Sequence, residues 1–126
     1  VTIFMELAEN GSLENLLQNV QNGFADHAYD NTIRQIILIG IARGMVHLHK
    51  HNVFHCDLKP GNILLDSNYR PSITDFGLSK ILDNSKTVSG GPCGTMAYMA
   101  PEIFDGNHLL GHQIKSVPTP TWHLNC

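Results

Sequence analysis

The segment that decides the fold reads VFHCDLKPGNILL and spans residues 53–65. Two short apolar runs frame a seven-residue polar loop, and runs of this kind bounded by turn residues are typical of β-strands. We therefore predict strands at Val53–His55 and Ile63–Leu65. Taken singly, the polar residues between them would read as a solvated loop Asp, a surface Lys and a turn Asn, so their meaning depends on the sequence around them.

The clearest helix pattern lies just upstream, between Thr32 and His49. Its apolar and small residues recur at i, i+3, i+4 and i+7 along one stripe: Ile33, Ile36, Ile37, Gly40, Ile41, Gly44, Met45 and Leu48. This spacing follows the 3.6-residue period and predicts one helix with a buried face. Each glycine costs about 1 kcal/mol of helix propensity relative to alanine. The two glycines on the stripe therefore indicate close packing against another element.

Shorter elements are expected before this helix. Val1–Met5 is a β-like apolar run, and a turn at residues 9–12 follows it. Ser12 is a good N-cap, so we predict a short helix at Leu13–Gln18.

The sequence after residue 65 favours one more strand and then a long loop. A polar turn at residues 66–68 leads to a strand around Ser72–Thr74. Residues 79–96 are rich in Ser, Thr, Gly and Asn and predict a long, mobile surface loop. From about residue 109 the sequence loses all periodicity.

Composition excludes several classes of protein. The chain has 126 residues, 42% of them hydrophobic and 15% charged, which argues against disorder. Its net charge of −3 does not favour binding to nucleic acid or acidic lipid, because both are negatively charged. No apolar run approaches the ~18 residues of a membrane span. Three widely spaced cysteines, Cys56, Cys93 and Cys126, form no disulfide framework and favour a reducing compartment.

Three short sequence motifs of this chain resemble motifs of one protein family. His55-Cys56-Asp57-Leu58-Lys59-Pro60-Gly61-Asn62 resembles the catalytic loop of eukaryotic protein kinases, Asp75-Phe76-Gly77 their DFG motif, and Ala100-Pro101-Glu102 their APE motif. Their order and spacing also match. The resemblance covers about residues 1–107 and implies an α+β, protein-kinase-like fold. That fold would be partial: the hinge plus the first part of the mainly helical C-lobe, with the N-lobe absent.

The resemblance implies a serine/threonine protein kinase that transfers the γ-phosphate of ATP to protein Ser or Thr with Mg²⁺. Asp57 would orient the substrate hydroxyl, and Lys59 would offset charge on the transferred phosphate. Asn62 and Asp75 would supply oxygen ligands to Mg²⁺. Thr95 resembles the threonine that bonds the catalytic Asp and Lys in kinases of this type.

By the same resemblance, the first segment lines an adenine site. Met5 would be the gatekeeper, while Glu6 and Ala8 would bond adenine through their backbone. Ser12 would lie near the ribose, and Leu64 would form the floor of the pocket. An edge strand leaving a sheet accounts equally well for these residue types, and only their linkage to the catalytic loop favours the adenine site.

Finer features refine the resemblance. Lys59, Thr95 and the Tyr98–Glu102 segment look most like the tyrosine-kinase-like group of serine/threonine kinases. His55 would be structural, stacking near Phe76. Cys56 stands where many kinases carry an Arg that pairs with an activation-loop phosphate. We therefore expect activity that does not depend on phosphorylation of this loop, whose hydroxyl residues include Ser85, Thr87 and Ser89.

Three histidines, His47, His49 and His51, alternate at the end of the long helix. Alternate positions on a helix face different directions, so the three cannot converge on one zinc ion without unwinding. We expect them to interact favourably with the helix dipole instead.

The expected domain organisation is a partial kinase domain at 1–107 and a non-kinase-like tail at 108–126, with a frameshift or mis-splicing as the hypothesis for the tail. The chain alone is expected to be inactive. The alternatives are a pseudokinase or binding module, and a non-functional truncated product. Expected partners are ATP and a protein substrate, with no nucleic acid and no membrane contact in this segment. The expected location is cytoplasmic, with tethering of the parent through other segments left open.

Overall fold

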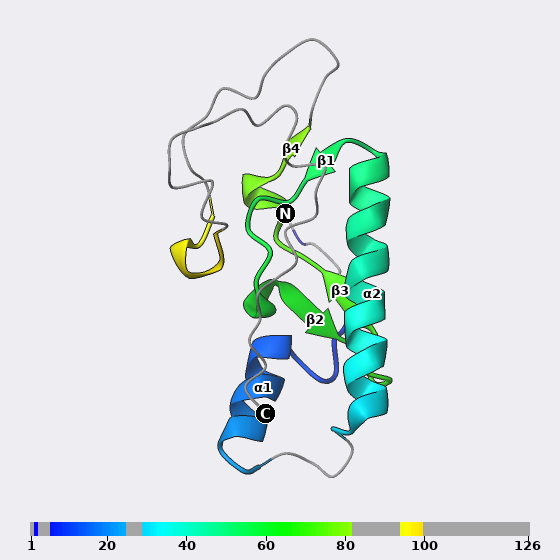
Figure 1. Ribbon diagram of the computed structural model, residues 1–126, viewed down its shortest axis with the longest axis vertical. Helices are drawn as coiled ribbons and strands as arrows, with labels where there is room; N and C mark the ends of the chain where they lie inside the picture. Colours follow the sequence, from blue (N-terminus) through cyan, green and yellow to red (C-terminus); the bar gives the residue numbers. More distant parts are fainter. Residues whose placement is uncertain (1, 3–5, 25–28, 82–93, 100–126) are drawn as a thin grey trace.

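The computed structural model describes residues 2, 6–24, 29–81 and 94–99. Its helices are α1 (Leu13–Gln21) and α2 (Asn31–Lys50), and its strands are β1 (Val53–Phe54), β2 (Ile63–Leu65), β3 (Pro71–Ile73) and β4 (Lys80–Ile81). Single 3₁₀ turns lie at Pro60–Asn62, Phe76–Leu78 and Met96–Tyr98. Figure 1 shows α2 along one side of the molecule, with β2 and β3 beside it and α1 near its N-terminal end. The result is the α+β arrangement that the sequence predicts.

Several predicted features lie outside the described residues. These are most of the first strand with Met5, the APE motif, the loop residues Ser85, Thr87 and Ser89, and the tail at 108–126. Within the described ranges, no helix combines the length and the apolar character that crossing a membrane requires.

Helix α2 confirms the prediction and extends it by one residue at each end. Asp30 is its N-cap, because one carboxylate oxygen accepts the N–H groups of Thr32 at 2.8 Å and Ile33 at 3.0 Å. Ile37 and Ile41 on the predicted stripe are buried. Ile36, at the margin of the stripe, is 36% exposed and does not join the core.

Both glycines of α2 lie where another element approaches the helix closely, as predicted. A Cβ on Gly40 would lie 2.6 Å from Cδ of Pro71, and a Cβ on Gly44 would lie 2.8 Å from Cδ1 of Ile73. Side chains at these positions would collide with β3. The glycines therefore set how closely β3 packs on α2.

Helix α1 begins as predicted and ends three residues later. The hydroxyl of Ser12 accepts the N–H of Asn15 at 3.2 Å, which makes it the N-cap. The helix continues to Gln21 because the N–H of Asn22 still bonds the carbonyl of Gln18 at 2.9 Å. Gly23, with φ of 75°, then ends it in the left-handed region that glycine favours.

Strands β2 and β3 form an antiparallel pair in which Ile63 faces Ile73 and Leu65 faces Pro71. The third strand thus begins at Pro71, slightly earlier than predicted. Proline has no N–H to donate, so the first position of a strand suits it. The segment before α1 also runs beside β2, since the N–H of Leu65 bonds the carbonyl of Gly11 at 2.8 Å.

Strands β1 and β4 pair antiparallel at the C-terminal end of α2 (Figure 1). The prediction of a loop throughout residues 79–96 is wrong at Lys80–Ile81, which form β4, and at Met96, where a 3₁₀ turn begins. Strand β1 also ends at Phe54 rather than at the next residue. A two-residue strand depends on a partner distant in sequence, so local composition does not reveal it.

Five buried apolar side chains form one core that joins α1, α2 and β2: Leu13, Ile37, Ile41, Ile63 and Leu65. Ile63 and Leu65 are fully buried. The same strand continues directly from the polar loop that begins after β1. The core therefore anchors one end of the candidate site.

Candidate active site

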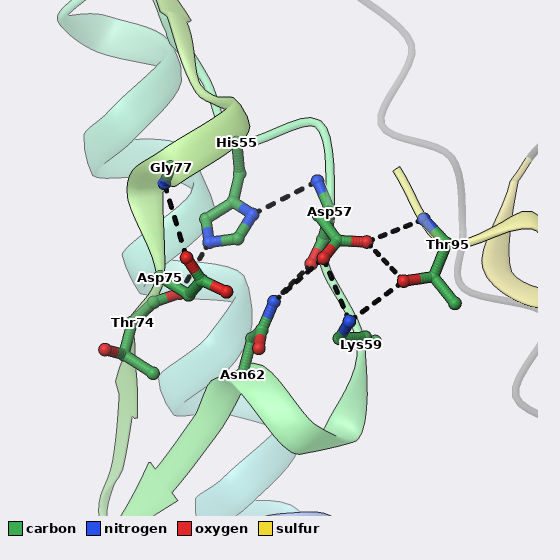
Figure 2. A network of polar contacts seen from close by, with 8 residues as sticks. All are labelled: His55, Asp57, Lys59, Asn62, Thr74, Asp75, Gly77 and Thr95. Carbon is green, nitrogen blue, oxygen red and sulfur yellow. Dashed lines mark hydrogen bonds and ion pairs between the residues drawn. The ribbon is translucent and has the colours of Figure 1, made fainter. Parts of the chain in front are cut away.

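Asp57 lies in the loop between β1 and β2 and is the centre of a polar network (Figure 2). Only 9% of the residue is exposed. Its Oδ1 accepts both the backbone N–H and the hydroxyl of Thr95, each at 2.7 Å. Its Oδ2 accepts from Nδ2 of Asn62 at 3.2 Å and forms an ion pair with Nζ of Lys59 at 3.0 Å. Both carboxylate oxygens are therefore held from two sides.

Thr95 closes this network into a ring. Its hydroxyl donates to Asp57 and accepts from Nζ of Lys59 at 2.9 Å. Asp57 and Thr95 lie 38 residues apart in sequence. The predicted contact of Thr95 with both residues is thus present, and it fixes the ammonium and the carboxylate relative to each other.

The network also determines the charge of Asp57. Burial acts to raise the pKa of this carboxyl group, but the hydrogen bonds from Thr95 and Lys59 and the attraction of the ammonium outweigh it, so the pKa lies below its usual range. The carboxylate is therefore ionised at neutral pH. It can accept a proton or orient a donor hydroxyl.

Gly94 allows Thr95 to reach the loop, a role that sequence reasoning missed. Its φ is 115°, in the region that L side chains rarely adopt, and a Cβ there would collide with the carbonyl oxygen of Cys56. The only signal in the sequence is a glycine directly before the threonine. The contact that requires it is with backbone distant in sequence.

His55 connects the loop to the segment after β3. Its Nε2 donates to the carbonyl of Thr74 at 2.8 Å, and its Nδ1 accepts the N–H of Asp57 at 3.3 Å. A backbone carbonyl only accepts and a backbone N–H only donates, so these partners place the ring hydrogen on Nε2. The ring is 99% buried and lies 5.1 Å from the ring of Phe76. The predicted contact with Phe76 is present, although the ring planes are inclined by 57° rather than stacked in parallel.

Asn62 and Asp75 come together through backbone contacts. The carbonyl of Asn62 accepts the N–H of Thr74 at 2.9 Å, which brings the next residue, Asp75, close to the loop. Nδ2 of Asn62 also donates to the carbonyl of Asp57 at 2.9 Å, which orients the amide. Asp75 has φ of 61°, and its Oδ1 accepts the N–H of Gly77 at 3.4 Å. Figure 2 shows the Asp75 carboxylate between the His55 ring and Asn62.

These two side chains fit a hard divalent cation. Among the described residues, no hydrogen bond occupies Oδ1 of Asn62 or Oδ2 of Asp75. Carboxylate and amide oxygens are ligands that Mg²⁺ accepts in small number, with water and phosphate completing its shell. The donor set therefore suits the cation that the sequence predicts.

Comparison with known proteins agrees with this geometry. The sequence pattern of the family described as Protein kinase domain matches residues 1–118. The chain belongs to the protein kinase family. The two helices and small antiparallel sheets of the described residues are consistent with part of the kinase fold, as predicted.

Similar proteins are named as serine/threonine kinases. A G-type lectin S-receptor-like serine/threonine-protein kinase of Oryza sativa subsp. indica is 41% identical over 103 residues, which are 79% of this chain and 12% of that protein. A probable LRR receptor-like serine/threonine-protein kinase of Arabidopsis thaliana is 42% identical over 110 residues, 82% of this chain and 10% of that protein. A serine/threonine-protein kinase of Drosophila virilis is 30% identical over 127 residues, covering 100% of this chain and 15% of that protein. The chain thus spans less than a fifth of the length of these relatives.

The structure brings together two of the residues predicted to hold adenine in this member of the kinase family. Ser12 and Leu64 form an isolated antiparallel β-bridge, so the start of α1 lies against β2. The carbonyl of Ala8 accepts the N–H of Gly11 at 3.1 Å, which forms a turn before α1. Glu6 is exposed, and Met5 lies outside the described residues. The adenine site itself stays a prediction.

Cys56, in the position where many kinases carry Arg, is half-buried and has φ of 65°. Its Sγ lies 3.5 Å from the carbonyl of Phe54. A thiol cannot form the charge-assisted pair that a guanidinium makes with phosphate. The expectation that activity does not depend on loop phosphorylation stays a prediction.

Proposed function

We propose that the chain carries the catalytic loop of a protein serine/threonine kinase, which transfers the γ-phosphate of ATP to a Ser or Thr hydroxyl of a protein. One observation carries the proposal: the Thr95 hydroxyl bridges Asp57 and Lys59. Phosphoryl transfer needs positioned charges more than covalent help from the protein. A carboxylate and an ammonium held 3.0 Å apart by a third residue supply such positioning.

Asp57 would act on the substrate hydroxyl. Its ionised carboxylate orients the hydroxyl and accepts its proton while the hydroxyl oxygen bonds to the γ-phosphorus and ADP leaves. The hydrogen bond from Asn62 to Oδ2 is the longest that this carboxylate accepts, at 3.2 Å. Asn62 keeps its shorter bond to the Asp57 carbonyl, so we expect a substrate hydroxyl to displace the longer one.

The negative charge of the phosphates would be offset by Lys59 and by a cation held by Asn62 and Asp75. The Lys59 ammonium, directed by Thr95, would lie near the transferred group and offset its negative charge. Asn62 and Asp75 would hold Mg²⁺ through Oδ1 and Oδ2 respectively. The bound ion would supply charge neutralisation at the phosphate oxygens.

Binding of ATP through Met5, Glu6, Ala8, Ser12 and Leu64 belongs to the same proposal, as does membership of the tyrosine-kinase-like group. We propose a protein substrate rather than nucleic acid, because the net charge is −3. We also propose that the reaction takes place in the cytoplasm, where ATP is available and where widely spaced cysteines stay reduced. Tethering of the natural protein to a membrane through other segments is compatible with this.

The test uses the natural protein that carries this sequence, at its natural length, with labelled ATP, Mg²⁺ and casein as substrate. We expect label on serine and threonine, and a loss of at least ~100-fold in rate for Asp57→Asn, since a positioned base contributes about 10²–10⁴-fold. Lys50→Ala, on the exposed end of α2, is the control and should retain full rate. Label on tyrosine alone would overturn the serine/threonine assignment.

The same sample distinguishes the non-catalytic alternative. Thermal unfolding is measured with and without ATP and Mg²⁺. A nucleotide-dependent rise in Tm without any phosphate transfer would replace the kinase proposal with a pseudokinase. Transfer that survives Asp57→Asn would refute the role of Asp57.

A further inference from the structure

Two exposed histidines meet at the C-terminal end of α2. His47 lies in the last turn, and His51 is the residue that caps the helix four positions later. Their ring centres are 4.4 Å apart and the ring planes are inclined by 44°. Residues four apart lie on one face of a helix, which explains the contact. Both side chains are open to water.

A hydrogen bond orients the second ring. Nδ1 of His51 lies 2.8 Å from the carbonyl oxygen of His47. The carbonyl can only accept, so Nδ1 carries the hydrogen, and in the neutral ring the lone pair is on Nε2. Metal-binding histidines commonly donate their other ring N–H to a carbonyl or carboxylate, which fixes the tautomer. In its neutral form His51 therefore already has the tautomer that leaves Nε2 available to a metal ion.

His49 does not join this pair. Its ring packs 5.5 Å from the ring of Phe54 in β1, and the residue is half-buried. The expectation that three alternate histidines cannot converge on one ion thus holds for the set of three. It overlooked that the first and third are four residues apart and share a face.

We propose that His47 and His51 form a two-histidine clamp for a late first-row divalent cation such as Zn²⁺. Imidazole nitrogens suit Zn²⁺, Cu²⁺ and Ni²⁺, and histidines at i and i+4 are the spacing by which a helix presents two ligands to one ion. The unpaired carbonyl groups at the C-terminal end of α2 also favour a positive charge there. The ion would join the last turn of α2 to its cap, just before β1 leads into the catalytic loop.

The clamp has two ligands from the described part of the chain. There, no set of three or more His, Cys, Asp or Glu side chains is placed to hold a metal ion. Water would complete the coordination shell, which the exposure of both rings allows. The site is therefore of moderate affinity and exchanges its ion readily.

The test measures Zn²⁺ binding to the 126-residue chain by competition with a chromogenic chelator. Four proteins are compared: the unaltered chain, His47→Asn, His51→Asn and the matched control His49→Asn. We expect each of the first two variants to lose one bound equivalent or at least tenfold in affinity, while the control stays within twofold. Equal behaviour of all four proteins would overturn the proposal, since any background from other histidines and cysteines is common to them.

A second measurement does not depend on affinity. Ring nitrogens are observed by NMR before and after addition of Zn²⁺, with far-UV circular dichroism confirming that the variants keep their helix content. We expect the Nε2 signal of His51 to shift and its Nδ1 to keep its hydrogen. A shift confined to Nδ1, or no shift at either nitrogen, would show that the pair serves only the helix dipole.

Discussion

At the scale of single residues, the site depends on how Asp57 is kept ionised inside the protein. Burial alone would favour the neutral carboxyl group, and the Thr95 and Lys59 contacts reverse that preference. The hydroxyl of Thr95 matters twice, because it bonds the carboxylate directly and also directs the ammonium. Thr95 is therefore the residue through which the charge of Asp57 can be changed without touching Asp57.

The first prediction concerns Thr95→Ala, which removes the hydroxyl and keeps the backbone N–H bond to Asp57. We expect the pKa of Asp57 to rise toward its usual range, with a loss of about 1.5–3 kcal/mol in unfolding free energy, as for other hydrogen bonds to charged groups. The pKa is measured by NMR titration of the carboxylate carbon. Thr95→Ser retains the hydroxyl and should restore the lower pKa. An unchanged pKa in Thr95→Ala would contradict the prediction.

The second prediction follows from the direction of the same shift. A carboxyl group whose pKa is lower in the folded state than in the unfolded state stabilises the fold at all pH above the unfolded value, and this stabilisation is lost as pH falls through the folded pKa. The contribution of Asp57 should therefore decline as pH falls below the unfolded pKa and be gone below the folded pKa. In Thr95→Ala, whose folded pKa is expected to lie closer to the unfolded value, we expect a smaller loss that is complete at a higher pH. Denaturant unfolding across the acid range measures this, and parallel pH profiles for the two proteins would count against it.

At the scale of elements, the contact of α2 with β3 distinguishes the two glycines of the helix. The atoms facing Gly40 belong to the Pro71 ring, which cannot move aside, whereas Gly44 faces the end of the flexible Ile73 side chain. Alanine improves helix propensity by about 1 kcal/mol at either position. The balance between propensity and collision should therefore differ between them.

The third prediction is that Gly40→Ala destabilises the chain, by about 1–3 kcal/mol as for other overpacked sites, while Gly44→Ala is near neutral. Urea unfolding provides the measurement. The control is Gln35→Ala on the exposed face of α2, which should change stability little. If Gly40→Ala stabilises the chain as much as Gly44→Ala does, the ring of Pro71 does not limit the packing of β3.

The elements that sequence analysis predicted well are those with local causes. The apolar stripe of α2 and the N-cap at Ser12 depend on residues close together in sequence. The first residues of both helices were therefore predicted to within one position. Strand β4 was missed because Lys80 and Ile81 become a strand only through pairing with β1. The end of α1 was misplaced because it depends on backbone bonds at Asn22 rather than on any composition signal.

At the scale of the whole molecule, one small core packs both helices against β2, the strand that follows the loop of the candidate site.

The fourth prediction is that Leu65→Ala, at a fully buried position, costs about 2–5 kcal/mol of unfolding free energy. Leu38→Ala is the matched control, because Leu38 is 47% exposed and should cost less than ~0.5 kcal/mol. Denaturant unfolding compares the two. Equal costs would mean that the core is not where the stability of the chain resides.

In the candidate site, the residues that act through side chains were predicted, and those that act through the backbone were not. Asp57, Lys59, Asn62 and Thr95 were identified from motif residues, and the structure brings their side chains together. Gly94 and Thr74 were not identified, since they act through backbone approach and backbone hydrogen bonds. Such roles leave little trace in residue type. Side-chain chemistry could be predicted from the sequence, and the backbone framework that aligns it could not.

Thr74 has a consequence for how this protein tolerates variation. Its N–H donates to the carbonyl of Asn62, and its carbonyl accepts from Nε2 of His55. The backbone of Thr74 therefore connects these two residues of the loop without using the side chain. A mutational scan would score position 74 as permissive, because most replacements keep both bonds. Replacing its amide nitrogen by an ester oxygen would remove the donor to Asn62 and reveal the dependence. Tolerance in such a scan therefore measures the freedom of a side chain, and it understates the importance of the peptide group that carries it.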